Sequence, residues 1–93
     1  MSEISKPTIE NVDITLADTE YSYTLPAGTR TFEFRFRNEE TFGKLAIAQG
    51  LSGTTYITVG QGETIKEEIK GGGVTLYFRG DNASDVAEIL SFK

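Results

Sequence analysis

The stretch Thr31-Phe32-Glu33-Phe34-Arg35-Phe36-Arg37 decides how this chain folds. Its apolar and polar residues alternate strictly, and successive side chains of a β-strand point to opposite sides. We therefore expect the three phenylalanines to face a core and the two arginines to face outward. A register slip of one residue would expose all three rings, at a cost of about 2 kcal/mol for each. The register of this strand is therefore fixed.

The same alternation recurs on both sides of this strand, and turn signals separate the alternating segments about every 8 to 12 residues. No segment keeps the 3.6-residue period of a helix for longer than one turn. We expect about eight short strands, in the ranges 12–16, 21–25, 31–37, 45–48, 56–59, 65–69, 74–79 and 86–92. The predicted fold is all-β, a single antiparallel β-sandwich of jelly-roll type over residues 12–93. Residues 1–11 are predicted to form a flexible N-terminal arm.

The alternation also predicts details of the sandwich. The segment Val86–Phe92 looks largely apolar on both faces, which is typical of a central strand. Leu25-Pro26-Ala27-Gly28 has proline at the second and glycine at the fourth position of a type I turn, which predicts a hairpin. Two further glycine-rich segments, 60–62 and 71–73, are interpreted as hairpin turns. The predicted core consists of Phe32, Phe34, Phe36, Leu45, Ile47, Leu76, Phe78 and Ile89.

The composition argues against catalysis. With 93 residues the chain has room for one domain. It contains no cysteine and no histidine, so disulfides and thiolate metal sites are excluded, and the main side chains of zinc and general-base chemistry are missing. Serine and threonine are abundant, but none lies in a recognisable nucleophile motif. We expect no enzyme activity, no cofactor and no metal ion.

The charge narrows the range of partners. A formal net charge of −5 and a pI near 4.6 repel nucleic acid phosphates and anionic membranes, so we expect neither free nucleic acid nor a membrane as a partner. The apolar runs are far shorter than the roughly 20 residues that span a bilayer, and the start of the chain lacks the apolar stretch of a secretory signal. We expect the protein to act where it is made or in an assembly built there.

Three short motifs lie between positions 79 and 85. Arg79-Gly80-Asp81 spells the integrin-recognition tripeptide, and Asn82-Ala83-Ser84 fits the glycosylation pattern. Asp81, Asn82 and Asp85 are possible calcium ligands, but their spacing lacks the alternate ligands of an EF-hand loop. Glycine, asparagine and aspartate after a strand are also what a tight turn requires. We interpret the whole segment as a turn, with Asp85 supporting it.

Four outward side chains are candidates for an interface. Arg35 and Arg37 lie on the outer face of their strand, where Glu33 and a cross-strand acid could neutralise them. Tyr77 and Arg79 share the face opposite to Leu76 and Phe78, and tyrosine and arginine are enriched at interfaces. The alternative for the tyrosine is a ring packed at the edge of the sandwich, with its hydroxyl group at the rim.

Two isoleucines of the arm complete the set of interface candidates. Ile4 and Ile9 are the only residues of the segment 1–11 that could pack. Such a segment has too little apolar surface to fold alone, but it can become ordered by laying its apolar side chains onto a partner. A plain disordered terminus is the alternative.

A family resemblance adds a functional expectation. The chain has Thr19-Glu20-Tyr21-Ser22, the turn at 25–28, the segment Arg30–Phe34, and Thr75-Leu76-Tyr77-Phe78 leading through a polar loop to Val86-Ala87-Glu88-Ile89. With these segments, residues 13–93 resemble a group of short tailed-phage virion proteins. The resemblance implies a non-enzymatic structural role, such as a capsid decoration or head-accessory subunit, and it assigns no functional residues.

The resemblance also implies partners and a location. The expected partners are other virion proteins, above all the major capsid protein, and further copies of the chain in a homo-oligomer, for which a trimer is favoured. The expected location is the virion, assembled in the host cytoplasm; the head, neck and tail all remain open. The alternative function is a carbohydrate-binding or host-attachment β-sandwich module of a tail or fibre. That function needs an aromatic platform or polar cleft, and the absence of tryptophan weakens it.

Overall fold

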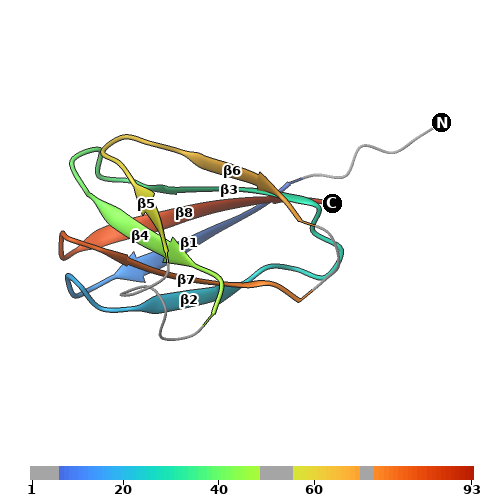
Figure 1. Cartoon of the computed structure of the whole chain (residues 1–93), viewed down its shortest axis with the longest axis horizontal. Coiled ribbons are helices and arrows are strands. Elements are labelled where there is room, and N and C mark those ends of the chain that lie inside the picture. The colour runs from blue at the N-terminus through green and yellow to red at the C-terminus, as the bar shows by residue number, and fades with distance from the viewer. Residues whose placement is uncertain (1–6, 49–55, 70–72) are drawn as a thin grey trace.

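The structure is a computed structural model of the chain that describes residues 7–48, 56–69 and 73–93. Within these ranges, eight strands form two four-stranded antiparallel sheets, and no residue is helical (Figure 1). The strands are β1 (Thr8–Ile14), β2 (Tyr21–Thr24), β3 (Thr31–Phe36), β4 (Gly43–Ala46), β5 (Ile57–Val59), β6 (Ile65–Glu68), β7 (Thr75–Gly80) and β8 (Asp85–Phe92). The prediction of an all-β fold of eight short strands is confirmed.

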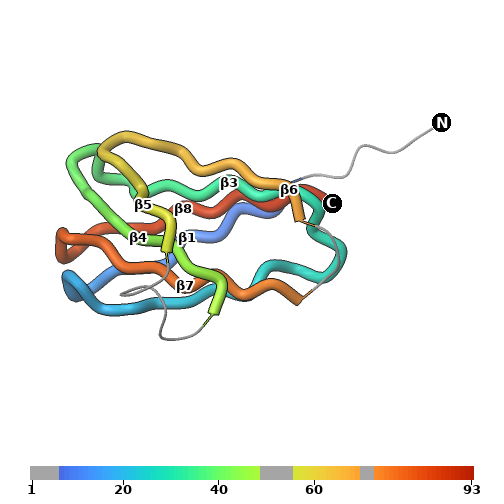
Figure 2. Tube along the Cα trace, in the orientation of Figure 1, coloured from blue at the N-terminus to red at the C-terminus, as the bar shows by residue number. Residues whose placement is uncertain are grey.

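The strand order identifies the type of sandwich. The first sheet has the order β1-β8-β3-β6 and the second sheet has the order β2-β7-β4-β5. The pairs β1–β8, β2–β7, β3–β6 and β4–β5 are nested, as in one long antiparallel ribbon that has folded over on itself. This is the jelly-roll arrangement, and the trace in Figure 2 passes repeatedly from one sheet to the other. The predicted central position of the last strand is also confirmed, since β8 lies between β1 and β3.

The prediction of a hairpin at Leu25–Gly28 is wrong. β2 pairs with β7, whereas β3 pairs with β6 and β8, so this turn carries the chain from the second sheet to the first. The turn also starts one residue later than expected, because Thr29 N donates to Pro26 O at 3.2 Å. Gly28 then occupies the third position with φ of 83°, which a type II turn requires. The chain changes sheets here because the apolar faces of β2 and β3 meet across the core.

The other glycine-rich turns also join different sheets. Gly60-Gln61-Gly62 connects β5 of the second sheet with β6 of the first, and Glu63 N donates to Gly60 O at 3.1 Å. β6 and β7 likewise belong to different sheets, and Gly71 and Gly72 between them lie outside the described residues. Both hairpin interpretations are therefore wrong. Among the described strands, β4 and β5 are the only consecutive pair joined within one sheet.

The core lies between the sheets and is centred on Phe34. Its ring centroid is 5.2 Å from that of Phe36 and 5.0 Å from that of Phe78. All but one of the predicted core residues are buried, together with Ile14, Leu25, Val59 and Ala87. The exception is Ile47, which is 75% exposed because β4 ends at Ala46 and the alternation stops there.

The domain begins earlier than the sequence suggests. β1 starts at Thr8, which lies opposite Ser91, and its pairing with β8 continues through Asn11 opposite Glu88. Residues 8–11 of the predicted arm are therefore part of the first sheet, while residues 1–6 lie outside the described ranges. These polar residues form a strand because β8 offers them a ladder of backbone donors and acceptors, which outweighs their weak apolar pattern.

Candidate functional site

The outer face of the first sheet brings together half of the predicted interface residues. Phe34 and Ile89 face the core, so Arg35 and Glu88, which are paired across β3 and β8, point outward. Ile9 of β1 lies opposite Leu90 of β8 on the same face. The structure therefore unites Ile9, Arg35 and Arg37 on one surface, which we call the first-sheet face.

Two arginines share one carboxylate at the centre of this face. Arg35 Nε donates to Glu88 Oε1 at 2.7 Å, and Arg37 Nε donates to Glu88 Oε2 at 2.8 Å. The hydrogen bond from Arg37 is the main reason why the pKa of Glu88 lies below its usual value. The cluster carries two positive charges against one negative charge. The arginine side chains are 60% and 53% exposed, so they remain accessible to a further anionic group.

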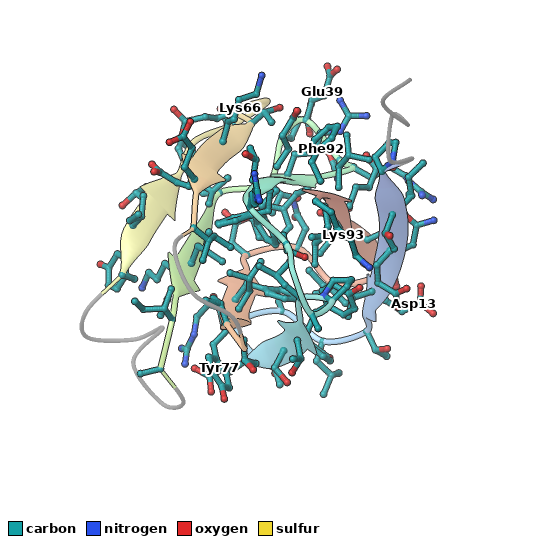
Figure 3. All side chains as sticks on the ribbon, turned by 90° about the vertical axis from the view of Figure 1, so that its right-hand side faces the viewer. Asp13, Glu39, Lys66, Tyr77, Phe92 and Lys93 are labelled. Carbon is teal, nitrogen blue, oxygen red and sulfur yellow. The ribbon has the colours of Figure 1, made fainter. Side chains whose placement is uncertain are left out.

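Apolar side chains border the arginines. Ile9 is 69% exposed, and Leu90 and Phe92 of β8 are partly buried on the same side of the sheet. A shallow hollow of about 280 Å³ is lined by Ile9, Leu90, Arg35 and Asn11, among others. In Figure 3, Phe92 and Lys66 are labelled on this side of the molecule. The face thus offers apolar contact area directly beside charged donors, a combination that suits protein recognition.

The opposite outer face holds the other described candidates. Tyr77 lies between Ser22 of β2 and Ala46 of β4, and Arg79 lies beside Lys44. Figure 3 shows Tyr77 on the side of the molecule opposite to Phe92 and Lys66. Tyr77 is half-buried there. The predicted interface residues therefore do not form one surface, and Ile4 lies outside the described residues.

The second-sheet face carries an aromatic ring that is already covered. Lys44 Nζ lies 4.8 Å from the centroid of the Tyr56 ring. This cation–π contact occupies one side of the ring and helps to hold the lysine against β5. The ring face on that side is not open to a planar or apolar ligand.

The segment 79–85 serves the fold, as predicted. Asp85 is buried; its Oδ1 accepts hydrogen bonds from Asn38 N at 3.0 Å and Val86 N at 2.7 Å, and its Oδ2 accepts one from Thr41 Oγ1 at 2.6 Å. Asn82 Nδ2 donates to the same threonine hydroxyl at 3.0 Å. These contacts tie the β3–β4 turn to the β7–β8 turn, so the prediction that Asp85 supports the turn is confirmed.

The integrin-type tripeptide is part of the same structure. Asp81 Oδ1 accepts a hydrogen bond from Phe42 N at 3.0 Å, and Gly80 is buried against Phe36 and Thr41. The carboxylate of Asp81 thus anchors the start of β4, because Phe42 directly precedes that strand. The three motifs of the sequence all have structural roles in the turns at this end of the sandwich.

Sequence reasoning missed the outward residues of β8. Glu88, Leu90 and Phe92 all contribute to the first-sheet face, although none was a candidate. A signal was present, because a strand that is apolar on both faces must place some apolar side chains outward unless another layer covers them. The partner acid of Arg35 and Arg37 was expected on a neighbouring strand, and the register identifies it as Glu88.

Comparison of the chain with protein-family models, with curated proteins and with solved structures finds no match. In the part of the chain that the structure describes, no three acidic side chains converge as a metal site would require. The same part contains no helix that is long and apolar enough to cross a membrane. The function is therefore to be inferred from the surfaces of the chain itself.

Proposed function

We propose that the chain is a non-enzymatic structural protein of a tailed-phage virion, namely a capsid decoration subunit that docks on the particle and stabilises it. The observation that carries this proposal is the first-sheet face, where the exposed Ile9 and the partly buried Leu90 and Phe92 lie beside two accessible arginines. Two further points support it. Residues 13–93 resemble short tailed-phage virion proteins, and the jelly roll is an architecture that viral capsid domains use. The latter is an analogy at the level of the fold.

The chemistry of the face defines what the partner provides. Arg35 and Arg37 together neutralise only one acid, so the cluster can accept a second carboxylate from the major capsid protein. Ile9 and Leu90 then take up apolar side chains of the same partner surface. The chain as a whole is acidic, with a net charge of −5. Projecting outward, this acidic body keeps particles apart by like-charge repulsion.

The carbohydrate-binding alternative receives less support from the second-sheet face. A sugar stacks on an open aromatic ring, but Lys44 covers one side of Tyr56 and Tyr77 is half-buried between its neighbours. Tyr77 therefore offers no free platform, and Tyr56 offers none on the side that Lys44 covers. A virion subunit that docks on protein remains the function that the surfaces favour.

Cosedimentation with capsids tests the proposal. The particles are capsids assembled from the major capsid protein that is encoded in the same genome, and bound protein is quantified after pelleting. The variant Arg35→Glu places a negative charge where the partner carboxylate would lie. We expect it to reduce the affinity by about tenfold or more, since like charges in an interface cost several kcal/mol.

The matched control is Lys44→Glu, which makes the same change in charge on the opposite face. It should bind as the unchanged protein does, and a melting curve verifies that both variants fold. Absence of binding by the unchanged protein would overturn the proposal. Equal loss in both variants would show that net charge, rather than the first-sheet face, governs binding, and would overturn the assignment of that face.

A further inference from the structure

The two edges of the sandwich, where the sheets meet at β1–β2 and at β5–β6, differ in how well side chains cover the core. On the β1–β2 side, Tyr21 and Tyr23 pack against the core, and Leu16 N donates to the Tyr21 hydroxyl at 3.0 Å. On the β5–β6 side the sheets leave an apolar groove of about 410 Å³. Ile47 and Ile57 at this groove are 75% and 52% exposed. We call it the β5–β6 groove; its lining includes Ile47, Ile57, Ile65, Glu67, Ile69 and Val74.

Glu67 occupies an unusual position in this groove. Ile65 and Glu67 lie opposite Phe34 and Phe32, both of which face the core, so Glu67 points to the same side as Ile65. The sequence thus places a carboxylate where its alternation with Ile65 and Ile69 would put an apolar side chain. Glu67 forms no ion pair with any residue in the described ranges. Glu67 is exposed, so an occupant of the groove that supplies a cation can reach its carboxylate.

β6 also offers backbone groups for pairing. It pairs with β3 on one side and, among the described strands, with none on the other. An inward-pointing charge on such an edge keeps it from pairing with unsuitable strands. An extended segment with a matching cation would overcome that barrier and add to the sheet, which is a common mode of peptide recognition.

The N-terminal residues of the chain have the required pattern. Ile4 and Lys6 are two positions apart, so in an extended strand they lie on one face, as Ile65, Glu67 and Ile69 do on β6. Beside β6, Ile4 would contact one of these isoleucines and Lys6 would reach Glu67. Among the described residues, the ladder between β1 and β8 begins at Thr8, and Pro7 before it has no N–H group to donate.

We propose that residues 1–6 of one copy add as an extended strand to the free edge of β6 in a second copy, with Ile4 in the β5–β6 groove and Lys6 paired with Glu67. β1, from which the segment starts, and β6, which receives it, are opposite edges of the first sheet. The contact therefore joins different surfaces of two copies. Head-to-tail contacts of this kind close into a ring when the rotation between successive copies allows it, and closure after three copies gives the trimer that the resemblance implies.

Sedimentation velocity of the full chain, without capsids, tests this contact. The expected species has three times the monomer mass of 10.2 kDa and dissociates on dilution. Deletion of residues 1–6, and separately Glu67→Lys, should each weaken assembly by about tenfold or more. The double variant Lys6→Glu/Glu67→Lys restores the ion pair with reversed charges and should restore assembly.

Glu39→Lys is the matched control, because it makes the same change in charge in the exposed β3–β4 turn, away from the groove. It should assemble as the unchanged protein does. Persistence of the trimer after the deletion would overturn the inference, as would a monomer at every concentration. Equal weakening by Glu39→Lys would also overturn it, because only the overall charge would then matter.

A peptide titration locates the contact. A synthetic peptide of residues 1–7 is added to isotope-labelled protein that lacks residues 1–6, and backbone amide signals are followed by NMR. Shifts concentrated in β6 and at Ile57 support the inference. Absence of binding, or shifts confined to the first-sheet face, would overturn it. Neither experiment contains a capsid, so the outcome is independent of the proposed docking on the particle.

Discussion

The ring of Phe36 on β3 fills the space in which a side chain at Gly43 on β4 would lie. A Cβ atom built on Gly43 would overlap two carbon atoms of this ring, and one built on Gly80 would lie 3.2 Å from a third. Gly43 and Gly80 are paired directly across β4 and β7. Two glycines in adjacent strands of the second sheet thus form the recess that receives an aromatic ring from the first.

This recess predicts that Gly43→Ala is destabilising. The added methyl group must displace a buried ring, and overpacking of this kind costs about 1–3 kcal/mol. Urea denaturation would measure the change in the free energy of unfolding. Gly60→Ala is the control, because the nearest atom to its built Cβ is 3.7 Å away. Equal stability of both variants would show that the ring moves aside at no cost.

Phe34 should be the most sensitive position of the core. It is fully buried and contacts both Phe36 and Phe78. Phe34→Ala removes a buried ring at a cost of about 3–5 kcal/mol, a large share of the about 5–15 kcal/mol that stabilises a domain. Thermal unfolding should show a large drop in the melting temperature, whereas Phe42→Ala, at a half-exposed ring, should have a small effect. An unchanged melting temperature for Phe34→Ala would contradict this packing.

The hydroxyl of Thr41 should be needed for the joined turns. It donates to the buried Asp85 and accepts from Asn82. Thr41→Val keeps the shape of the side chain but leaves both partners without that hydrogen bond, which costs about 1–3 kcal/mol. Thr58→Val, at an exposed threonine, provides the comparison. Chemical denaturation of the two variants side by side tests the difference, and equal stabilities would show that water replaces the lost hydroxyl.

The shared carboxylate predicts a specific pH dependence. The pKa of Glu88 in the folded state lies below its usual value, mainly because of the hydrogen bond from Arg37. The stabilisation is therefore present at pH values above the usual glutamate pKa and is lost as the pH falls through the lower pKa of the folded state. Each pair involves an exposed arginine, so its contribution is about 0.2–1 kcal/mol.

Glu88→Gln isolates this contribution. At about pH 7 the variant should be less stable than the unchanged protein, and the difference should shrink as the pH falls through the lowered pKa of Glu88, because both side chains are then neutral. Urea denaturation at a series of decreasing pH values measures it. A difference that is independent of pH would mean that packing, and not charge, accounts for the effect of the substitution.

The fold illustrates which features alternation can predict. The strictly alternating residues of β3 predicted their buried and outward sides correctly, because a strand has only two faces. The partners of each strand depend on long-range pairing, which local sequence does not encode. Leu25–Gly28 has the composition of a hairpin turn, yet it joins the two sheets. Ile47 was misassigned because alternation does not reveal where a strand ends.

In the candidate site, too, local sequence predicted the direction of single side chains but not which strands lie side by side. The outward directions of Arg35 and Tyr77 followed from their own strands, but only the strand order reveals that they lie on opposite faces of the sandwich. Ile9 was expected in a flexible arm and lies in β1, because pairing with β8 orders a segment whose own pattern is weak. For Glu67, alternation gives the same side as Ile65 and Ile69, and the register of β6 on β3 shows that this side faces the core.

The most direct test of docking through the first-sheet face is an electron cryomicroscopy reconstruction of capsids saturated with the protein. The predicted result is added density on the outside of the shell, into which the sandwich fits with β1, β8, β3 and β6 facing the capsid and Arg35 and Arg37 at the contact. The second sheet, with Tyr77, should face outward. Absence of added density, or a sandwich bound through β2, β7, β4 and β5, would contradict the account.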